Sequence, residues 1–249
     1  MLAWGATDKG VVRQQNQDAF KLDAERKGER PPRPVFVVVC DGMGGASAGN
    51  VASDIAVKTA FEVITRVITP RMSPRQMRLA LEEAVAEANT AVCGYAEAHP
   101  ECFGMGTTLV TALVSDGLAV LANVGDSRAY KISNDGEISR ETIDHSLVSD
   151  LVRLGELTEE QARNHPRKNY ITRALGTEES VKCDIFEVKL NAGEFLLLCS
   201  DGLTNMLGDK EILYEVIHGG EHAGACRRLI AAANHRGGHD NITVALLSM

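Results

Sequence analysis

The sequence lacks the features that mark proteins for nucleic acids or membranes. Its 249 residues contain 26 Lys and Arg against 34 Asp and Glu, a formal net charge of −8. An acidic chain without a basic stripe cannot neutralise a phosphate backbone, so no nucleic-acid partner is expected. No apolar run approaches the roughly 20 residues that span a bilayer, and no basic segment precedes an apolar one at the N-terminus. These absences predict a cytoplasmic protein without membrane insertion.

Cysteine and histidine patterns typical of zinc or redox sites are also missing. The six cysteines include no C-x-x-C pair and stand mostly in apolar runs, which favours small buried side chains. The seven histidines show no H-E-x-x-H spacing, so zinc is not indicated. Apolar residues make up 44% and charged residues 24%, without repeats, as in ordinary globular proteins. We expect one domain over residues 1–249.

The apolar pattern predicts an α+β protein. Strands are expected at 35–40, 107–114, 118–124, 129–133, 185–190, 195–199 and 243–247. Helices are expected at 47–63, from Pro74 with Ser73 as N-cap, and at 147–154, 158–163, 209–217 and 223–233. Residues 27–34, rich in proline and charge, predict a loop. A turn at Asp116-Gly117 would join 107–114 to 118–124, and 129–133 would continue into another turn at Asp135-Gly136, which together predict a β-meander. Hairpin-linked strands with grouped helices predict a layered sandwich of antiparallel sheets covered by helices.

Three aspartates stand at the ends of predicted strands. Asp41 follows 35–40, Asp201 follows 195–199, and Asp240 precedes 243–247. Asp-Gly is also the commonest hairpin turn, so each aspartate has a structural interpretation too. Unlike a hairpin turn, however, Asp41 and Asp201 each lead towards a helix. Strand ends are rigid, so the three carboxylates can converge on one point.

Converging carboxylates predict a particular kind of metal. Hard oxygen ligands favour Mg²⁺ or Mn²⁺. Two such ions would acidify a shared water and hold a phosphate ester in line for displacement. Arg13 stands five residues before Asp18, and in an extended strand this odd spacing places them on opposite faces. They would meet only at a bulge or a strand end, and a surface ion pair is the alternative.

Seven motifs together resemble one known family. The chain is similar over nearly its whole length to the bacterial-type PPM (type 2C) metal-dependent protein phosphatases. This resemblance implies a central pair of antiparallel β-sheets flanked by α-helices, and hydrolysis of phosphoserine and phosphothreonine in proteins. The motifs, in the family's order, are Arg13 with Asn16-Gln17-Asp18, Asp41-Gly42-Met43-Gly44-Gly45, Gly106-Thr107-Thr108, Gly125-Asp126-Ser127-Arg128, Asp144-His145-Ser146, Ser200-Asp201-Gly202-Leu203 and Asp240-Asn241.

The resemblance also assigns metal ligands. Asp41 would bridge two Mn²⁺ or Mg²⁺ ions, and the Gly42 carbonyl would bind one of them. Asp201 and Asp240 would bind the other ion. Asp18 would act through metal-bound waters.

Further roles follow from the same resemblance. Arg13 would hold the substrate phosphate through two parallel hydrogen bonds, which lysine cannot copy. Asp126 would support a third, weaker ion. Residues 145–175 would form a flap beside the site, with His165 as a candidate acid. Met43 stands where many eukaryotic members have a histidine that serves as general acid, so water or another group must protonate the leaving oxygen.

Three other functions are compatible with parts of this sequence. A non-catalytic phosphoprotein-binding pseudophosphatase should have lost a metal aspartate, but Asp41, Asp201 and Asp240 are all present. A phosphatase of a partner-switching regulator would keep the chemistry and change the substrate. A two-metal nuclease or phosphodiesterase fits the acidic charge less well. We expect a monomer that acts on phosphorylated proteins and reverses a bacterial Ser/Thr kinase, the last on family analogy alone.

Overall fold

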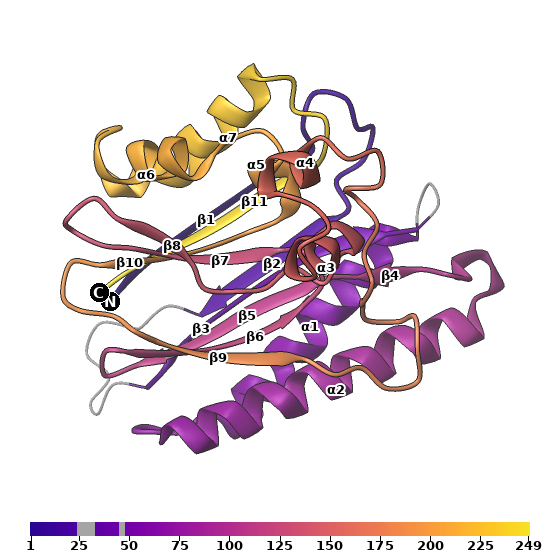
Figure 1. Ribbon diagram of the computed structural model, residues 1–249. Helices are drawn as coiled ribbons and strands as arrows, with labels where there is room; N and C mark the ends of the chain where they lie inside the picture. The colour runs from indigo at the N-terminus through magenta and orange to yellow at the C-terminus, as the bar shows by residue number, and fades with distance from the viewer. Residues whose placement is uncertain (24–32, 45–47) are drawn as a thin grey trace.

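The computed structural model describes residues 1–23, 33–44 and 48–249. Two antiparallel sheets are stacked face to face, with helices on both outer faces (Figure 1). One sheet has the strand order β1-β11-β10-β7-β8 and the other β2-β3-β5-β6-β9, with β4 paired to β3. The long helices α1 and α2 cover the second sheet, and α6 and α7 cover the first (Figure 1). The predicted layered sandwich of antiparallel sheets is confirmed.

The elements have the following bounds. The strands are β1 Leu2–Asp8, β2 Asp18–Asp23, β3 Val35–Met43, β4 Gly106–Thr107, β5 Leu109–Ser115, β6 Leu118–Val124, β7 Arg128–Ile132, β8 Ile138–Arg140, β9 Asp184–Lys189, β10 Phe195–Cys199 and β11 Ile242–Ser248. The α-helices are α1 Gly49–Val67, α2 Pro74–Ala98, α3 Leu147–Arg153, α4 Glu159–Arg163, α5 Asp201–Thr204, α6 Asp209–Ile217 and α7 Ala225–His235. Short 3₁₀ turns lie at Pro100–Cys102 and His222–Gly224.

Strand β3 shows how the layers are built. Val35, Val37 and Val39 belong to the apolar layer between the sheets. The alternate residues, such as Phe36 and Val38, pack under α1 and α2. Because successive side chains of a strand point to opposite faces, a strand buried on both faces must be apolar throughout. A third apolar cluster joins the other sheet to α6 and α7.

Two predicted features need correction. Strands β1, β2 and β8 were not predicted, and the β-meander is wrong. Strands β5 and β6 form the predicted hairpin, but β7 pairs with β10 and β8 in the other sheet. The chain changes sheets at Gly125, whose φ of +104° is incompatible with a continuing strand and is unfavourable for residues with a Cβ. Hydrophobic alternation does not reveal which sheet a strand joins.

The helix start at Ser73 is confirmed. Gln76 N donates to Ser73 Oγ at 3.3 Å and Ser73 N donates to Gln76 Oε1 at 2.9 Å, a reciprocal capping box. The predicted start of the first helix at 47, and most of the predicted loop at 27–34, lie outside the described residues. Among the residues that are described, no helix is both long and apolar enough to cross a membrane.

Candidate metal centre and active site

The predicted aspartates meet at one end of the layer between the sheets. Val35, Val37 and Val39 face that layer, so two-residue alternation carries Asp41 to the same face. The strand was predicted to end at Cys40. It continues to Met43, and its last two residues pair with β4. The unpredicted β2 places Asp18 directly opposite Asp41 in the strand register. Like charges paired across strands are destabilising, which points to a function for the pair.

Asp201 reaches the same place from the other sheet. It is the first residue of α5, directly after β10 and Ser200. Ser200 Oγ donates to Asp18 Oδ2 at 2.7 Å, and Thr243 N donates to Ser200 Oγ at 2.9 Å. These buried hydrogen bonds connect β2, β10 and β11. The two sheets are therefore held together at the carboxylates.

Asp240 and Arg13 lie at the more exposed rim. Arg13 Nη2 donates to Asp240 Oδ2 at 2.7 Å, with 48% of the Arg13 side chain and 25% of the Asp240 side chain exposed. Asn241 N donates to the other oxygen, Asp240 Oδ1, at 2.8 Å. The predicted Arg13 therefore does reach the carboxylates, but its partner in this structure is Asp240 and not Asp18.

Asn241 fixes the segment that carries Arg13. Its side-chain Nδ2 donates to Lys9 O and to Gln15 O, both at 2.9 Å. Its Oδ1 accepts from Gln17 N at 2.8 Å. A single buried amide thus binds the β1–β2 connection on both sides of Arg13. In the sequence Asn241 is only part of a motif, and no local signal indicates this role.

Asp126 lies where the chain crosses from one sheet to the other. It is 8% exposed and follows Gly125 at the end of β6. Ser127 Oγ lies 2.7 Å from Thr108 Oγ1, and Asp41 N donates to that same threonine oxygen at 2.9 Å. The crossing is therefore coupled to the backbone of Asp41 through two hydroxyl groups.

Burial and mutual repulsion dominate the electrostatics. Burial, followed by repulsion from neighbouring carboxylates, raises the pKa of Asp41 well above its usual range. Burial also raises the pKa of Asp18 to about 7, although Ser200 donates to its carboxylate. The pKa values of Asp126 and Asp201 are raised for the same two reasons. The cluster therefore disfavours its own negative charge, and a cation would relieve this.

The carboxylates fit a divalent cation. One buried oxygen each of Asp18, Asp126 and Asp201 accepts no hydrogen bond. Buried carboxylate oxygens are normally satisfied, and hard cations prefer such ligands. As the side chains stand, no three Asp, Glu, His or Cys residues in the described part of the chain enclose one point. Arg13 and Asn241 each donate one hydrogen bond to a different oxygen of Asp240, and each oxygen keeps a lone pair for an ion.

Two glycines are required by close backbone approach. A Cβ on Gly42 would lie 2.0 Å from Gly49 O, and one on Gly202 would lie 1.9 Å from Asn241 O. No side chain fits such distances without displacing backbone. The Asp-Gly pairs at 41 and 201 are therefore packing requirements of the site and not hairpin turns. Both of the predicted Asp-Gly turns are hairpin turns: Asp116-Gly117 joins β5 to β6, with φ values of +50° and +78°, and Asp135-Gly136 joins β7 to β8.

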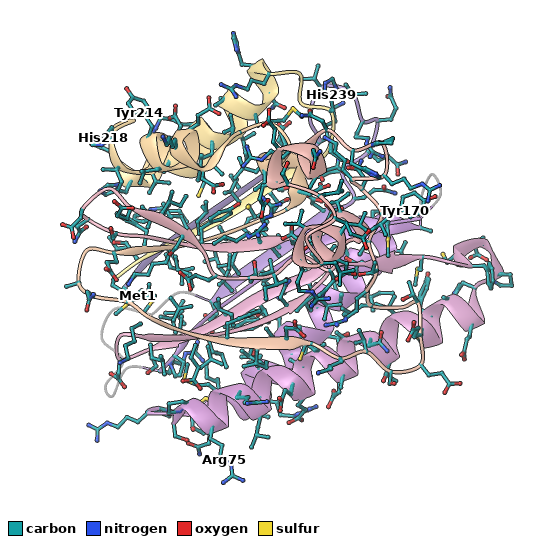
Figure 2. The ribbon with its side chains drawn as sticks, viewed as in Figure 1. Met1, Arg75, Tyr170, Tyr214, His218 and His239 are labelled. Carbon is teal, nitrogen blue, oxygen red and sulfur yellow. The ribbon has the colours of Figure 1, made fainter. Side chains whose placement is uncertain are left out.

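The predicted flap lies at the same end of the molecule. Helices α3 and α4 fall within it, and Figure 2 shows Tyr170 and His239 at the end opposite Met1. His165 sits in a turn after α4, where its Nδ1 accepts from Arg167 N at 3.1 Å. No hydrogen bond or ion pair within the described ranges joins His165 to any of the five aspartates.

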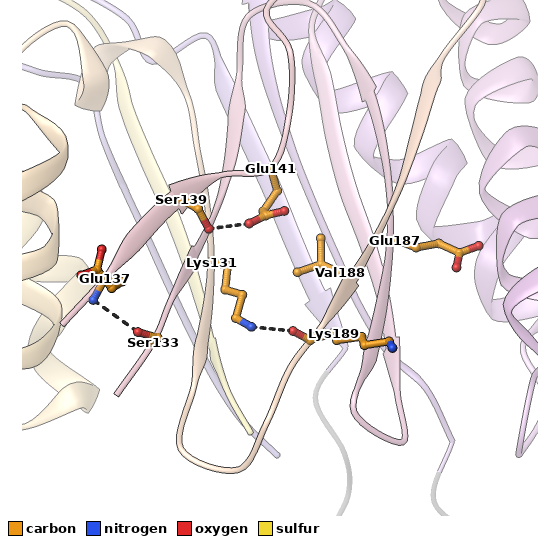
Figure 3. Close-up of a pocket in the computed structure, with 8 residues that line it drawn as sticks. All are labelled: Lys131, Ser133, Glu137, Ser139, Glu141, Glu187, Val188 and Lys189. Atoms are coloured by element: carbon orange, nitrogen blue, oxygen red, sulfur yellow. Dashed lines mark hydrogen bonds between the residues drawn. The ribbon is translucent and has the colours of Figure 1, made fainter. Parts of the chain in front are cut away.

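A separate groove of about 430 Å³ lies between the edge strands of the two sheets (Figure 3). Lys131 Nζ crosses it to donate to Lys189 O at 2.9 Å and pairs with Glu194 at 2.8 Å. None of the predicted site residues lines this groove. Its lining residues are Lys131, Ser133, Glu137, Ser139, Glu141, Glu187, Val188 and Lys189.

Comparisons with known proteins agree with the geometry. The family model described as protein phosphatase 2C matches residues 10–244. The chain is 42% identical to a serine/threonine phosphatase stp of Listeria innocua, over 97% of this chain and 93% of that protein. It superimposes on the serine/threonine phosphatase Stp1 of Staphylococcus aureus with a TM-score of 0.90 at 36% identity, covering 99% and 94% of the two chains.

A further solved structure bears on the cation. It is the catalytic domain of the serine threonine protein phosphatase PstP in complex with two manganese ions, with a TM-score of 0.82, 32% identity and coverage of 98% and 96%. The match extends along nearly the whole chain in both sequence and structure. The chain therefore belongs to the protein phosphatase 2C family of metal-dependent protein serine/threonine phosphatases.

Proposed function

We propose that the carboxylate cluster is the catalytic site of this phosphatase. Asp41, the Gly42 carbonyl, Asp201 and Asp240 would hold two Mn²⁺ or Mg²⁺ ions. The observation that carries the proposal is the convergence of buried and half-buried aspartates from both sheets, with unpartnered oxygens and raised pKa values. Such a cluster costs stability unless cations neutralise it, so its presence favours a metal site.

Two divalent ions at this place would supply an acidified water and would neutralise charge on the phosphate oxygens. The protein's own contribution is orientation. Asp41 is held on a rigid strand, with its backbone N donating to Thr108 Oγ1 and its carbonyl accepting from Thr108 N. Asp18 is oriented by Ser200, which leaves its other oxygen free for a water in the site. These contacts support a role for Asp18 through water.

Arg13 is the proposed phosphate ligand. Its guanidinium already reaches the cluster through Asp240, and its side chain is half exposed. The planar fork can donate two parallel hydrogen bonds to a phosphate. Because Asn241 fixes the backbone on both sides, the guanidinium is held within reach of the site.

Protonation of the leaving serine or threonine oxygen is assigned to solvent. Met43, the last residue of β3, has no proton to give. His165 is the remaining candidate from the sequence, and its ring is engaged by Arg167 N. We therefore propose water as the acid, with His165 acting only after a movement of the flap.

The finer assignments are also proposals. Asp126, buried and with an unpartnered oxygen, would hold a third ion. Residues 145–175 would form a flap that selects among phosphorylated proteins. The substrates would be products of a protein Ser/Thr kinase. Arg13 is a single exposed positive side chain, which favours a phosphate monoester over the many phosphates of a nucleic acid.

The test is hydrolysis of p-nitrophenyl phosphate and of a phosphothreonine peptide by the EDTA-treated protein, with and without added Mn²⁺ or Mg²⁺. Metal-dependent release of phosphate from both, lost in Asp41→Asn but retained in the turn variant Asp116→Asn, is the expected result. An Asp41→Asn protein with undiminished turnover would exclude Asp41 from the site. No turnover by the folded wild-type protein under either metal would favour a phosphoprotein-binding module.

A further inference from the structure

Two of the sequence motifs bind one another behind the proposed site. The Arg128 guanidinium donates through Nε to Asp144 Oδ1 at 3.0 Å and through Nη2 to Asp144 Oδ2 at 2.6 Å. His145 N donates to Gly125 O at 2.9 Å, and Gly125 N donates to His145 Nδ1 at 3.0 Å. The turn that carries Asp126 is thus fastened on both sides to the segment 144–145.

The hydrogen bonds fix the protonation of the His145 ring. Because Nδ1 accepts from Gly125 N, the proton of the neutral ring must be on Nε2. Nε2 lies 3.3 Å from Asp184 Oδ2, which can accept that proton. The buried His145 thus uses one ring nitrogen as acceptor and the other as donor.

Arg173 lies beside this ring nitrogen. Its Nη1 lies 2.9 Å from His145 Nε2, but it donates to Lys182 O at 3.0 Å and to Asp184 Oδ1 at 2.9 Å. Asp184 therefore accepts from both the arginine and the imidazole. Burial, together with the nearby Arg173 charge, lowers the pKa of His145, so the ring is neutral at pH 7.

His145 is also the point where the two ends of the flap meet. Its carbonyl accepts from Thr172 N at 2.8 Å, next to Arg173. Leu147 N donates to Tyr170 O at 2.9 Å, and Ser146 forms a β-bridge with Ile171. Residues 145–147 at the start of the flap are therefore paired with residues 170–172 near its end, at the same place that holds Gly125.

We propose that His145 is a positioning residue that joins the Gly125-Asp126 turn to both ends of the flap. Its Nδ1 holds the turn, its Nε2 holds Asp184 and through it Arg173, and its backbone holds Thr172. The inference rests on the proposed function where it concerns Asp126 and the third ion. Movement of the flap and placement of the Asp126 carboxylate are then one coupled event, because one side chain fixes both.

Two substitutions separate the contacts of the ring. In His145→Asn the amide oxygen reaches about the position of Nδ1 and can accept from Gly125 N, but nothing reaches Asp184. In His145→Ala both contacts are lost. His222→Asn is the matched control, because that ring lies near Phe195 and Val216 on the other helical layer.

The first measurement is hydrogen–deuterium exchange of the metal-free proteins. His145→Ala should exchange at least about 10-fold faster than wild type at Gly125, Leu147 and Thr172, with the core strands unchanged. His145→Asn should keep the protection at Gly125 and lose it at the flap ends. His222→Asn should match wild type. If His145→Ala does not fold, the exchange pattern of His145→Asn alone tests the proposal.

The second measurement concerns the ions. In His145→Ala the Mn²⁺ concentration for half-maximal turnover should rise about 10-fold, whereas the tightest Mn²⁺ affinity by calorimetry should change less than about twofold. Unchanged exchange at Gly125 and the flap ends would overturn the proposal, as would faster exchange spread equally over the whole chain. If wild type showed no turnover, the proposed function would fail, but the exchange data would still decide the role of His145.

Discussion

Asp18→Asn tests whether the carboxylate cluster is a cation site. Asp18 is buried opposite Asp41, and burial and repulsion from neighbouring aspartates raise its pKa to about 7. Asparagine has nearly the same shape, and its amide oxygen can still accept from Ser200 Oγ. The substitution therefore removes the charge and keeps the hydrogen bond.

The direction in which the stability changes with pH follows from proton linkage. Between pH 4 and pH 7 the folded protein keeps a proton on Asp18 that the unfolded chain has lost, so the stability of the metal-free protein falls as pH rises. A pKa raised from 3.8 to about 7 corresponds to about 4 kcal/mol by pH 8. Between about 1 and 2 kcal/mol of this is already present at pH 5, which leaves about 2–3 kcal/mol between pH 5 and pH 8.

The assay is urea unfolding in EDTA at pH 5 and pH 8. The stability of Asp18→Asn relative to wild type should rise by about 2–3 kcal/mol between the two pH values. The exposed turn variant Asp116→Asn should show no such rise. Added Mn²⁺ should stabilise wild type more than Asp18→Asn, because the charge that destabilises the metal-free fold then supports the ions.

A constant difference between Asp18→Asn and wild type at the two pH values would refute the reasoning. It would mean that contacts within the folded, metal-free protein already stabilise the negative charge of Asp18. Equal stabilisation of both proteins by Mn²⁺ would remove Asp18 from the metal site.

Three further predictions concern other parts of the site. Arg13→Ala should raise the KM for a phosphothreonine peptide by about 10-fold or more, and Arg13→Lys should restore little of it, because lysine cannot donate in parallel; an unchanged KM in steady-state assays would remove Arg13 from phosphate binding. Gly202→Ala should lose about 1–3 kcal/mol in thermal unfolding, since its Cβ would lie 1.9 Å from Asn241 O. Gly94→Ala, with nothing within 4 Å of its Cβ in a helix, should instead be neutral or up to about 1 kcal/mol more stable, and equal losses in both would contradict the packing argument. Asn241→Ala should loosen the segment that carries Arg13 and therefore raise the KM for the same peptide. The tightest Mn²⁺ affinity, measured by calorimetry, should stay within about threefold of the wild-type value. A KM equal to that of wild type would show that contacts other than those of Asn241 hold the segment.

The local sequence pattern was sufficient to predict an element where a single feature, such as a fully apolar run or a capping residue, determines its structure. The run at 35–40 predicts a buried strand because both of its faces are apolar, and the capping residues at Ser73 predict a helix start that the structure confirms. The aspartates at 41 and 201 stood out because each follows such a run. Strand β2 gave no clear signal, since its residues are half polar, and so the direct pairing of Asp18 with Asp41 was missed.

The sequence by itself determined the residue types of the site, the α+β class and the family resemblance, because these depend on local order along the chain. Only the tertiary structure decided which sheet each strand joins, and hence that β7 leaves the hairpin of β5 and β6 at Gly125. It also decided that Arg13 meets Asp240, 227 positions away, and that His145 closes on Gly125. Such contacts arise from the stacking of two sheets, and no periodicity in a single chain encodes that packing.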